Sequence, residues 1–137
     1  MSWGQTNLRF EQNLGQTDRR AQFLARTRQA TVFVTTNDTL FSLRGAGTTT
    51  ADVRMRFGGA STGNWTPEQK TKATIASYVG PPSNWRDEIP VFERLRRKNV
   101  YPGIDLVYYG EGRDLEYDFE LAPGSDVHRI RDRKSVV

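Results

Sequence analysis

Three carboxylates alternate along a short segment of the sequence, and their spacing raises the question of acid–base chemistry. Glu116, Asp118 and Glu120 are separated by single aromatic residues. A glycoside hydrolase needs one carboxylic acid and one carboxylate on opposite sides of a cleft. Alternate residues of a strand share one face, however, and no neighbour raises the pKa of one carboxylate above another. We therefore predict a solvated acidic face, and rank a glycoside hydrolase third among the functions considered.

Other catalytic and metal sites have few candidate residues. The chain has no cysteine and a single histidine, His128, which excludes thiol nucleophiles, thiolate zinc sites and histidine-rich metal sites. A serine–histidine triad would depend on His128 alone, and we interpret it as a surface residue. Asp105, Asp114 and Asp118 are candidate Ca²⁺ ligands, but no loop has the regular spacing of a calcium site. We predict no catalytic residue, no metal site and no cofactor.

Aromatic side chains are the remaining candidates for ligand binding, because they can stack against sugars or bases. Most aromatic residues in strands pack in cores, and we expect this of Trp65, Tyr101 and Tyr108. Trp85 differs because residues 83–86 are predicted to form a loop, in which Arg86 is a cation partner. The sequence therefore predicts a ligand site at Trp85, Arg86 and Tyr109, with a surface glycan or a protein as ligand.

The elements that must position these residues are predicted to be strands. Pro102 and Gly103 form a turn, and residues 104–109 then alternate as a strand does. After a glycine-bearing break, residues 115–121 alternate in the same way, so the two segments predict a hairpin.

Further strands are predicted upstream of this hairpin. A second hairpin is expected at 31–36 and 39–44, with single strands at 53–57 and 73–79. Residues 60–72 read as a polar loop that could hold one helical turn. About six strands and hardly any helix predict an all-β fold, an antiparallel two-sheet β-sandwich. If strand 53–57 were beside 115–121, its two arginines would complement the acidic face.

The composition is that of one domain with a modest positive charge. The chain has 137 residues, 36% of them hydrophobic, and a net charge of +4 from 20 basic and 16 acidic residues. Basic residues are spread along the chain, with one dense run at 94–98, so we expect no nucleic-acid partner. No apolar run is long enough for a membrane span, and residues 1–6 do not resemble a signal peptide.

Four stretches of the sequence together resemble a known type of bacterial domain. They are 8–18, 23–26, 77–86 and 100–124. The chain resembles the N-terminal domain of secreted bacterial proteins that carry seven-bladed β-propeller-type (SBBP) repeats. The signature residues of this resemblance are Tyr101, Pro102, Gly103, Asp105, Tyr108, Tyr109, Gly110, Glu116, Tyr117 and Asp118.

This resemblance implies an all-β domain in an extracellular or cell-surface protein, with downstream β-propeller repeats as its partner. It assigns no catalytic residues. The sequence departs from it at Arg97 and Lys98, where relatives tend to have an aromatic and a polar residue. The first-ranked function is therefore a non-catalytic structural or interaction module, and the second is a carbohydrate-binding module that uses exposed aromatic residues.

The last six residues, DRKSVV, resemble the translation of a common sequencing adapter. We therefore expect one β-rich domain at 1–131 and a non-native tail at 132–137. A domain interrupted in this way would lack its C-terminal strands and would leave an unpaired sheet edge.

Overall fold

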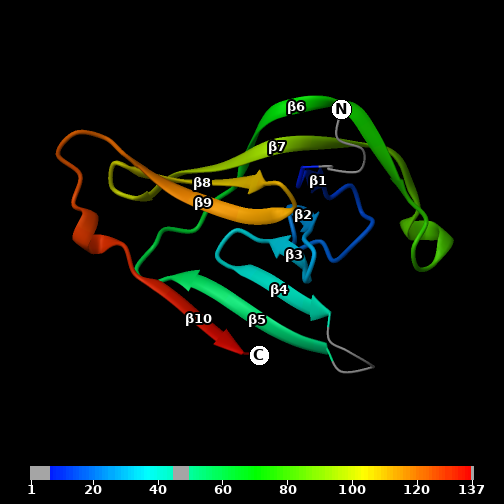
Figure 1. The fold of residues 1–137 in the computed structure, drawn as a ribbon, viewed down its shortest axis with the longest axis horizontal. Coiled ribbons are helices and arrows are strands. Elements are labelled where there is room, and N and C mark those ends of the chain that lie inside the picture. Colours follow the sequence, from blue (N-terminus) through cyan, green and yellow to red (C-terminus); the bar gives the residue numbers. More distant parts are fainter. Residues whose placement is uncertain (1–6, 45–49, 137) are drawn as a thin grey trace.

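The computed structural model describes residues 7–44 and 50–136, which form ten β-strands and two short 3₁₀ helices, η1 (Pro82–Asn84) and η2 (Val127–Arg129) (Figure 1). The all-β prediction is confirmed. The strands are β1 (Phe10–Gln12), β2 (Phe23–Arg26), β3 (Ala30–Val34), β4 (Thr39–Arg44), β5 (Thr50–Phe57), β6 (Thr66–Ser77), β7 (Arg86–Tyr101), β8 (Ile104–Glu111), β9 (Asp114–Leu121) and β10 (Asp132–Val136).

All of these strands belong to one antiparallel sheet, and this differs from the two separate sheets that we predicted. The order is β10-β5-β4-β3-β2-β1-β7-β8-β9, with β6 paired to the other edge of β7. The halves stay joined because β1 pairs with β2 on one side and with β7 on the other. Along one edge of β7, β1 pairs with Val91 and Phe92 while β8 pairs with residues 94–101.

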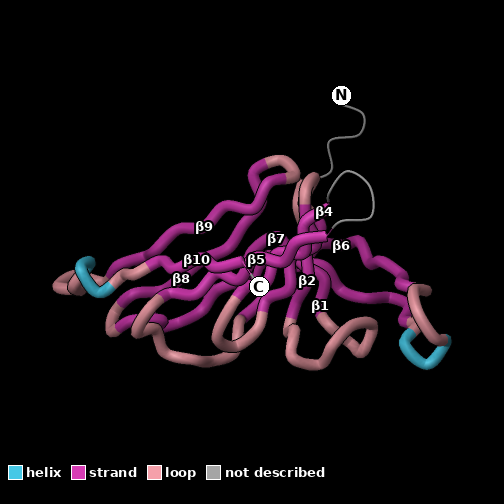
Figure 2. The backbone as a smooth tube through the Cα atoms, turned by 90° about the horizontal axis from the view of Figure 1, so that it is seen from below, coloured by secondary structure: helices cyan, strands magenta, loops and turns pink. Residues whose placement is uncertain are grey.

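The sheet curls so that its two halves face each other across a core (Figures 1 and 2). Phe57 of β5 contacts Tyr117 and Phe119 of β9 edge to face, with ring centroids 5.7 and 5.2 Å apart. These strands lie near opposite ends of the strand order, so only curling brings them together. The largest fully buried side chains of the core cluster are Phe10, Val32, Val34, Met55, Leu95, Ile104, Leu106 and Tyr108.

Several signature residues between 101 and 118 make contacts that hold the fold together. The hydroxyl of Tyr101 donates to the carbonyl of Gly58 at 2.8 Å, and the buried Tyr108 hydroxyl lies 2.7 Å from the hydroxyl of Thr39. Gly103 has a φ of 72°, which only glycine adopts readily. The predicted hairpin is present as β8 and β9, with Tyr108 opposite Tyr117.

The prediction for residues 60–72 is wrong in its second half, because β6 begins at Thr66. The side chains of β6 are mostly exposed, so no hydrophobic alternation marks the strand. Its backbone pairs with residues 86–96 of β7, with register shifts between Lys70 and Thr74 and between Ile75 and Ser77. Pairing with a long neighbour thus overrides the loop-like local sequence, and Pro67 is tolerated because β6 is an edge strand.

β5 and β9 are not neighbours in the strand order, so the condition under which the arginines of β5 would complement the acidic face is not met. Arg54 and Arg56 form ion pairs with Asp38 instead, because β5 faces β9 through its apolar side. On the edge of β5, residues 132–136 pair as β10, with Asp132 opposite Phe57. The non-native origin of residues 132–137 remains a prediction.

Candidate functional site

The tip of the β6–β7 hairpin carries a group of exposed apolar side chains. Tyr78, Val79 and Trp85 are 58%, 68% and 45% exposed, and the rings of Tyr78 and Trp85 meet edge to face with centroids 5.6 Å apart. The tip contains η1 and projects to one extreme of the molecule (Figure 2). We call these three residues the tip cluster. Exposed rings with polar atoms at their edges are typical of binding surfaces.

Hydrogen bonds hold the tip cluster in a defined shape. Arg86 donates to the carbonyl oxygens of Leu14 and Ser83, both at 2.8 Å, and so ties the tip to the loop after β1. The indole N–H of Trp85 donates to the carbonyl of Gly80 at 3.0 Å. The hydroxyl of Tyr78 hydrogen bonds to the Asp87 carboxylate, which raises the pKa of Tyr78. The rings are therefore preorganised before any partner arrives.

The three residues predicted to bind a ligand do not form one site. Trp85 and Arg86 are neighbours, but the guanidinium of Arg86 is engaged with backbone carbonyls. Tyr109 lies on β8 opposite Arg94 and donates its hydroxyl to Asp118 at 3.2 Å. The stretch of β7 from Arg86 to Arg94 covers roughly 25 Å at the ordinary strand rise. Tyr109 is therefore remote from the tip cluster.

One carboxylate of the acidic face of β9, Glu120, is part of an ion-pair network on the outer side of β6–β9. Arg96 contacts Glu68 at 2.9 Å, Asp105 at 3.0 Å and Glu120 at 2.6 Å, while Arg94 contacts Glu68 and Glu120. The hydrogen bond from Arg96 lowers the pKa of Glu120. A glycosidase acid needs a raised pKa, so this carboxylate is unsuited to the third-ranked function.

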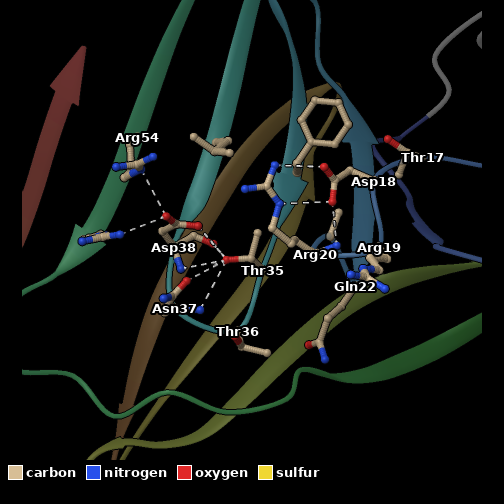
Figure 3. A pocket seen from close by; sticks show the side chains of 14 residues that line it. Thr17, Asp18, Arg19, Arg20, Gln22, Thr35, Thr36, Asn37, Asp38 and Arg54 are labelled. Atoms are coloured by element: carbon tan, nitrogen blue, oxygen red, sulfur yellow. Dashed lines mark hydrogen bonds and ion pairs between the residues drawn. The ribbon is translucent and has the colours of Figure 1, made fainter. Parts of the chain in front are cut away.

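A cleft lies on the outer face of the other half of the sheet. It has a volume of about 630 Å³ and lies between the loop 17–22, the β3–β4 turn at 35–38, and β5 (Figure 3). Phe33 and Leu40, which are opposite each other in β3 and β4, contribute its apolar part. Both side chains are half-buried, and Phe33 alternates with the core residues Val32 and Val34. We call this feature the arginine cleft.

Two ion-paired groups line the arginine cleft. Asp38 lies 3.2 Å from Arg54 and 3.5 Å from Arg56, and it accepts a 2.6 Å hydrogen bond from the hydroxyl of Thr35. On the other side of the cleft, Arg20 donates two hydrogen bonds to the carboxylate of Asp18, from Nε at 3.2 Å and from Nη2 at 2.9 Å (Figure 3). These hydrogen bonds lower the pKa of Asp18 to about 2.

Sequence reasoning did not find this cleft, although it noticed several of its parts. The outward arginines of 53–57 and the turn at 37–38 were both visible in the pattern. What brings them beside the loop 17–22 is the order β5-β4-β3-β2. That order depends on long-range pairing, which local alternation does not encode.

Comparison with known proteins identifies the family. Residues 10–135 match the family described as a domain of unknown function, DUF7948. The chain belongs to the DUF7948 family. No curated protein and no solved structure matches it.

The match spans both halves of the curled sheet of this DUF7948 domain, including the tip cluster and the arginine cleft. Within residues 7–44 and 50–136, no three potential metal ligands gather into a group that could hold an ion. In the same ranges, no helix has the length and hydropathy needed to cross a membrane.

A buried carboxylate of the DUF7948 domain makes its stability depend on pH. Glu11 of β1 is 6% exposed and lies 3.4 Å from Arg26. Its Oε1 atom has no hydrogen-bond partner among the described residues. Burial raises the pKa of Glu11 above its ordinary value of 4.5, and Arg26 opposes that shift. The protonated form is therefore favoured on folding.

This direction predicts a pH-dependent difference between wild type and Glu11→Gln. The stabilisation linked to Glu11 is fully present below pH 4.5 and is lost as the pH rises through the raised pKa. Urea unfolding should show that the advantage of Glu11→Gln over wild type shrinks as the pH falls from 7 to 4.5. In an Arg26→Met background the pKa of Glu11 should be raised further, because Arg26 no longer opposes the shift. The advantage of Glu11→Gln should then begin to shrink at a higher pH. An advantage that grows on acidification would contradict the assignment.

Proposed function

We propose that this DUF7948 domain is a non-catalytic interaction module of an exported, cell-surface bacterial protein, and that it docks onto the SBBP β-propeller repeats of that protein. The observation that carries the proposal is the exposed, preorganised tip cluster. Trp and Tyr dominate the energetics of protein interfaces, and rigid rings lose little conformational entropy on binding. Residues 77–86, which include the cluster, also carry part of the resemblance to SBBP-repeat proteins.

The charges around the tip cluster support a protein partner with an apolar, basic-rimmed surface. Asp87 and Glu88 are exposed beside the cluster at the start of β7, next to Arg86, whose guanidinium is bound to backbone carbonyls. Two carboxylates against one arginine leave the rim negative on balance. Apolar centres surrounded by polar rims are the common anatomy of protein interfaces.

Substitution Trp85→Ala tests this function. Against a separately produced SBBP-repeat segment, we expect Kd to increase about 30-fold or more, as for an interface hot spot, while stability changes little because Trp85 is 45% exposed. Leu121→Ala is a matched control, since Leu121 is 44% exposed at the end of β9. Calorimetric titration of wild type and both variants gives the comparison. Equal affinities for all three proteins would contradict the proposal.

A carbohydrate-binding module is the second candidate, and the exposed indole of Trp85 favours it. Sugar rings pack their apolar faces against exposed aromatic rings, and Tyr78 would extend that surface. A panel of neutral glycans, titrated against wild type and Trp85→Ala, separates the two functions. Glycan binding that is lost in Trp85→Ala, without binding to the repeats, would replace the first proposal with the second.

A further inference from the structure

The arginine cleft has donor capacity that its own carboxylates do not use. Among the described residues, Arg56 has one polar contact, 3.5 Å from Asp38, and its side chain is 53% exposed, so within that part of the chain most of its five N–H donors are not used. The Nε atom of Arg54 is buried and lies 3.2 Å from Asp38, but among the described residues it has no hydrogen-bond partner. This side of the cleft is therefore rich in incompletely satisfied donors.

On the opposite side of the cleft, the ion pair between Arg20 and Asp18 can open at a low cost in free energy. Arg20 and Asp18 are 82% and 53% exposed in their side chains, and exposed ion pairs of this kind contribute little to stability. An incoming carboxylate could therefore replace Asp18 on Arg20. The pKa of Arg20 is raised by its hydrogen bond to Asp18, and Asp38 adds to that shift, so the two sides act on one another electrostatically.

The acceptors in the cleft restrict the ligand further. Asp18 and Asn37 line it together with the arginines, and carboxylate and amide oxygens accept hydrogen bonds from hydroxyl groups. The half-buried Phe33 offers an apolar surface beside them. A group that matches all three features has one carboxylate, several hydroxyls and an apolar face.

From this combination we infer that the arginine cleft binds a sugar unit that carries one carboxylate. Arg20 holds the carboxylate in place of Asp18, and the exposed Arg56 adds positive charge from the other side of the cleft. Asp18 and Asn37 accept from neighbouring hydroxyls, and Phe33 packs against the ring. Arginine suits this role because its planar fork matches a carboxylate. The site is separate from the tip cluster, so it stands whether or not the domain docks onto a propeller.

Two other anionic partners fit the cleft less well. Nucleic acid carries a charge on every nucleotide, and its binding needs a continuous basic track; here Asp18 and Asp38 interrupt the arginines. An acidic peptide would supply carboxylates but few hydroxyls for the acceptors. The acidic sugar is the ligand that uses both the donors and the acceptors.

Titration with small saccharides tests the inference on the intact domain. The acidic probes are trigalacturonic acid, which presents the carboxylate on a uronic acid, and 3′-sialyllactose, which presents it on a sialic acid. The uncharged control is trigalacturonic acid with all of its carboxylates converted to methyl esters. The variants are Arg20→Gln/Arg56→Gln, and Lys98→Gln/Arg113→Gln as the control. Lys98 and Arg113 are exposed and lie outside the cleft, so both double variants lose the same charge.

We expect at least one acidic probe to bind wild type and the control alike, with affinity reduced about tenfold or more in Arg20→Gln/Arg56→Gln and for the methyl ester. Whichever acidic probe binds identifies the source of the carboxylate. Asp18→Asn should tighten binding, because it removes the competing anion and keeps an acceptor. This variant gives an answer even if the double variant fails to fold.

Several results would overturn the inference. They are no binding of either acidic probe, equal binding of the acid and its ester, or equal loss in both double variants, which would indicate general charge attraction. An oligonucleotide that binds wild type and loses affinity only in the cleft variant would assign the cleft to nucleic acid instead.

Discussion

Arg97→Ala is expected to lower the free energy of unfolding by about 3 kcal/mol, because it removes two hydrogen bonds from a charged donor to part-buried carbonyls and removes a buried stem. Arg97 is only 4% exposed. Its guanidinium donates to the carbonyl oxygens of Thr36, at 2.7 Å, and of Ser61. The guanidinium also lies 5.7 Å from the ring centroid of Trp65. One side chain thus links β7 to two loops.

Urea unfolding measures this effect, and two substitutions separate its causes. Arg97→Met keeps the stem but not the donors, so it should cost about 2 kcal/mol. Lys98→Ala changes the exposed neighbour and should cost less than about 0.5 kcal/mol. If Arg97→Ala were as mild as Lys98→Ala, Arg97 would not be the link described here.

Gly110→Ala is expected to destabilise the domain by about 2 kcal/mol, in the range for overpacked sites. A Cβ at this position would lie 2.6 Å from Cβ, 3.0 Å from the carbonyl oxygen and 3.2 Å from Cα of Leu8. Leu8 cannot move aside freely, because it is buried and its N–H donates to the carbonyl of Gly112 at 2.6 Å. The backbone that leads into β1 must therefore shift.

Thermal unfolding and hydrogen exchange test this prediction together. The Leu8 amide should exchange faster in Gly110→Ala, because its bond to Gly112 is strained. Gly63→Ala is the control, since the nearest atom to its Cβ would be Nε of Arg97 at an ordinary 3.7 Å. If Gly110→Ala behaved like Gly63→Ala, the close approach of Leu8 would not matter for stability.

The parts of the fold that could be predicted are those in which local sequence and tertiary environment agree. In the hairpin of β8 and β9, turn residues, alternation and one buried face all indicate the same structure. Only the second half of β6 was predicted, as part of the strand at 73–79; its first half could not be, because backbone pairing to β7 rather than side-chain burial defines it. The single curled sheet was also missed, because it depends on the three-residue strand β1, which pairs on both sides.

The candidate sites follow the same division. The place of Trp85 in an exposed loop could be read from the prolines and glycine around it. The engagement of Arg86 with Leu14 could not, because the two residues are far apart in sequence. The same is true of the arginine cleft, which combines a loop, a turn and a strand that only the sheet order brings together.

The most direct test of the proposed function is a photo-crosslink from position 85. Trp85 would be replaced by p-benzoylphenylalanine in this domain, the variant would be mixed with a separately produced SBBP-repeat segment, and crosslinked peptides would be identified by mass spectrometry. The account predicts crosslinks from position 85 to the repeats, with none from the same group at position 121. Crosslinks confined to the domain itself, or equal yields from both positions, would contradict docking through the tip cluster.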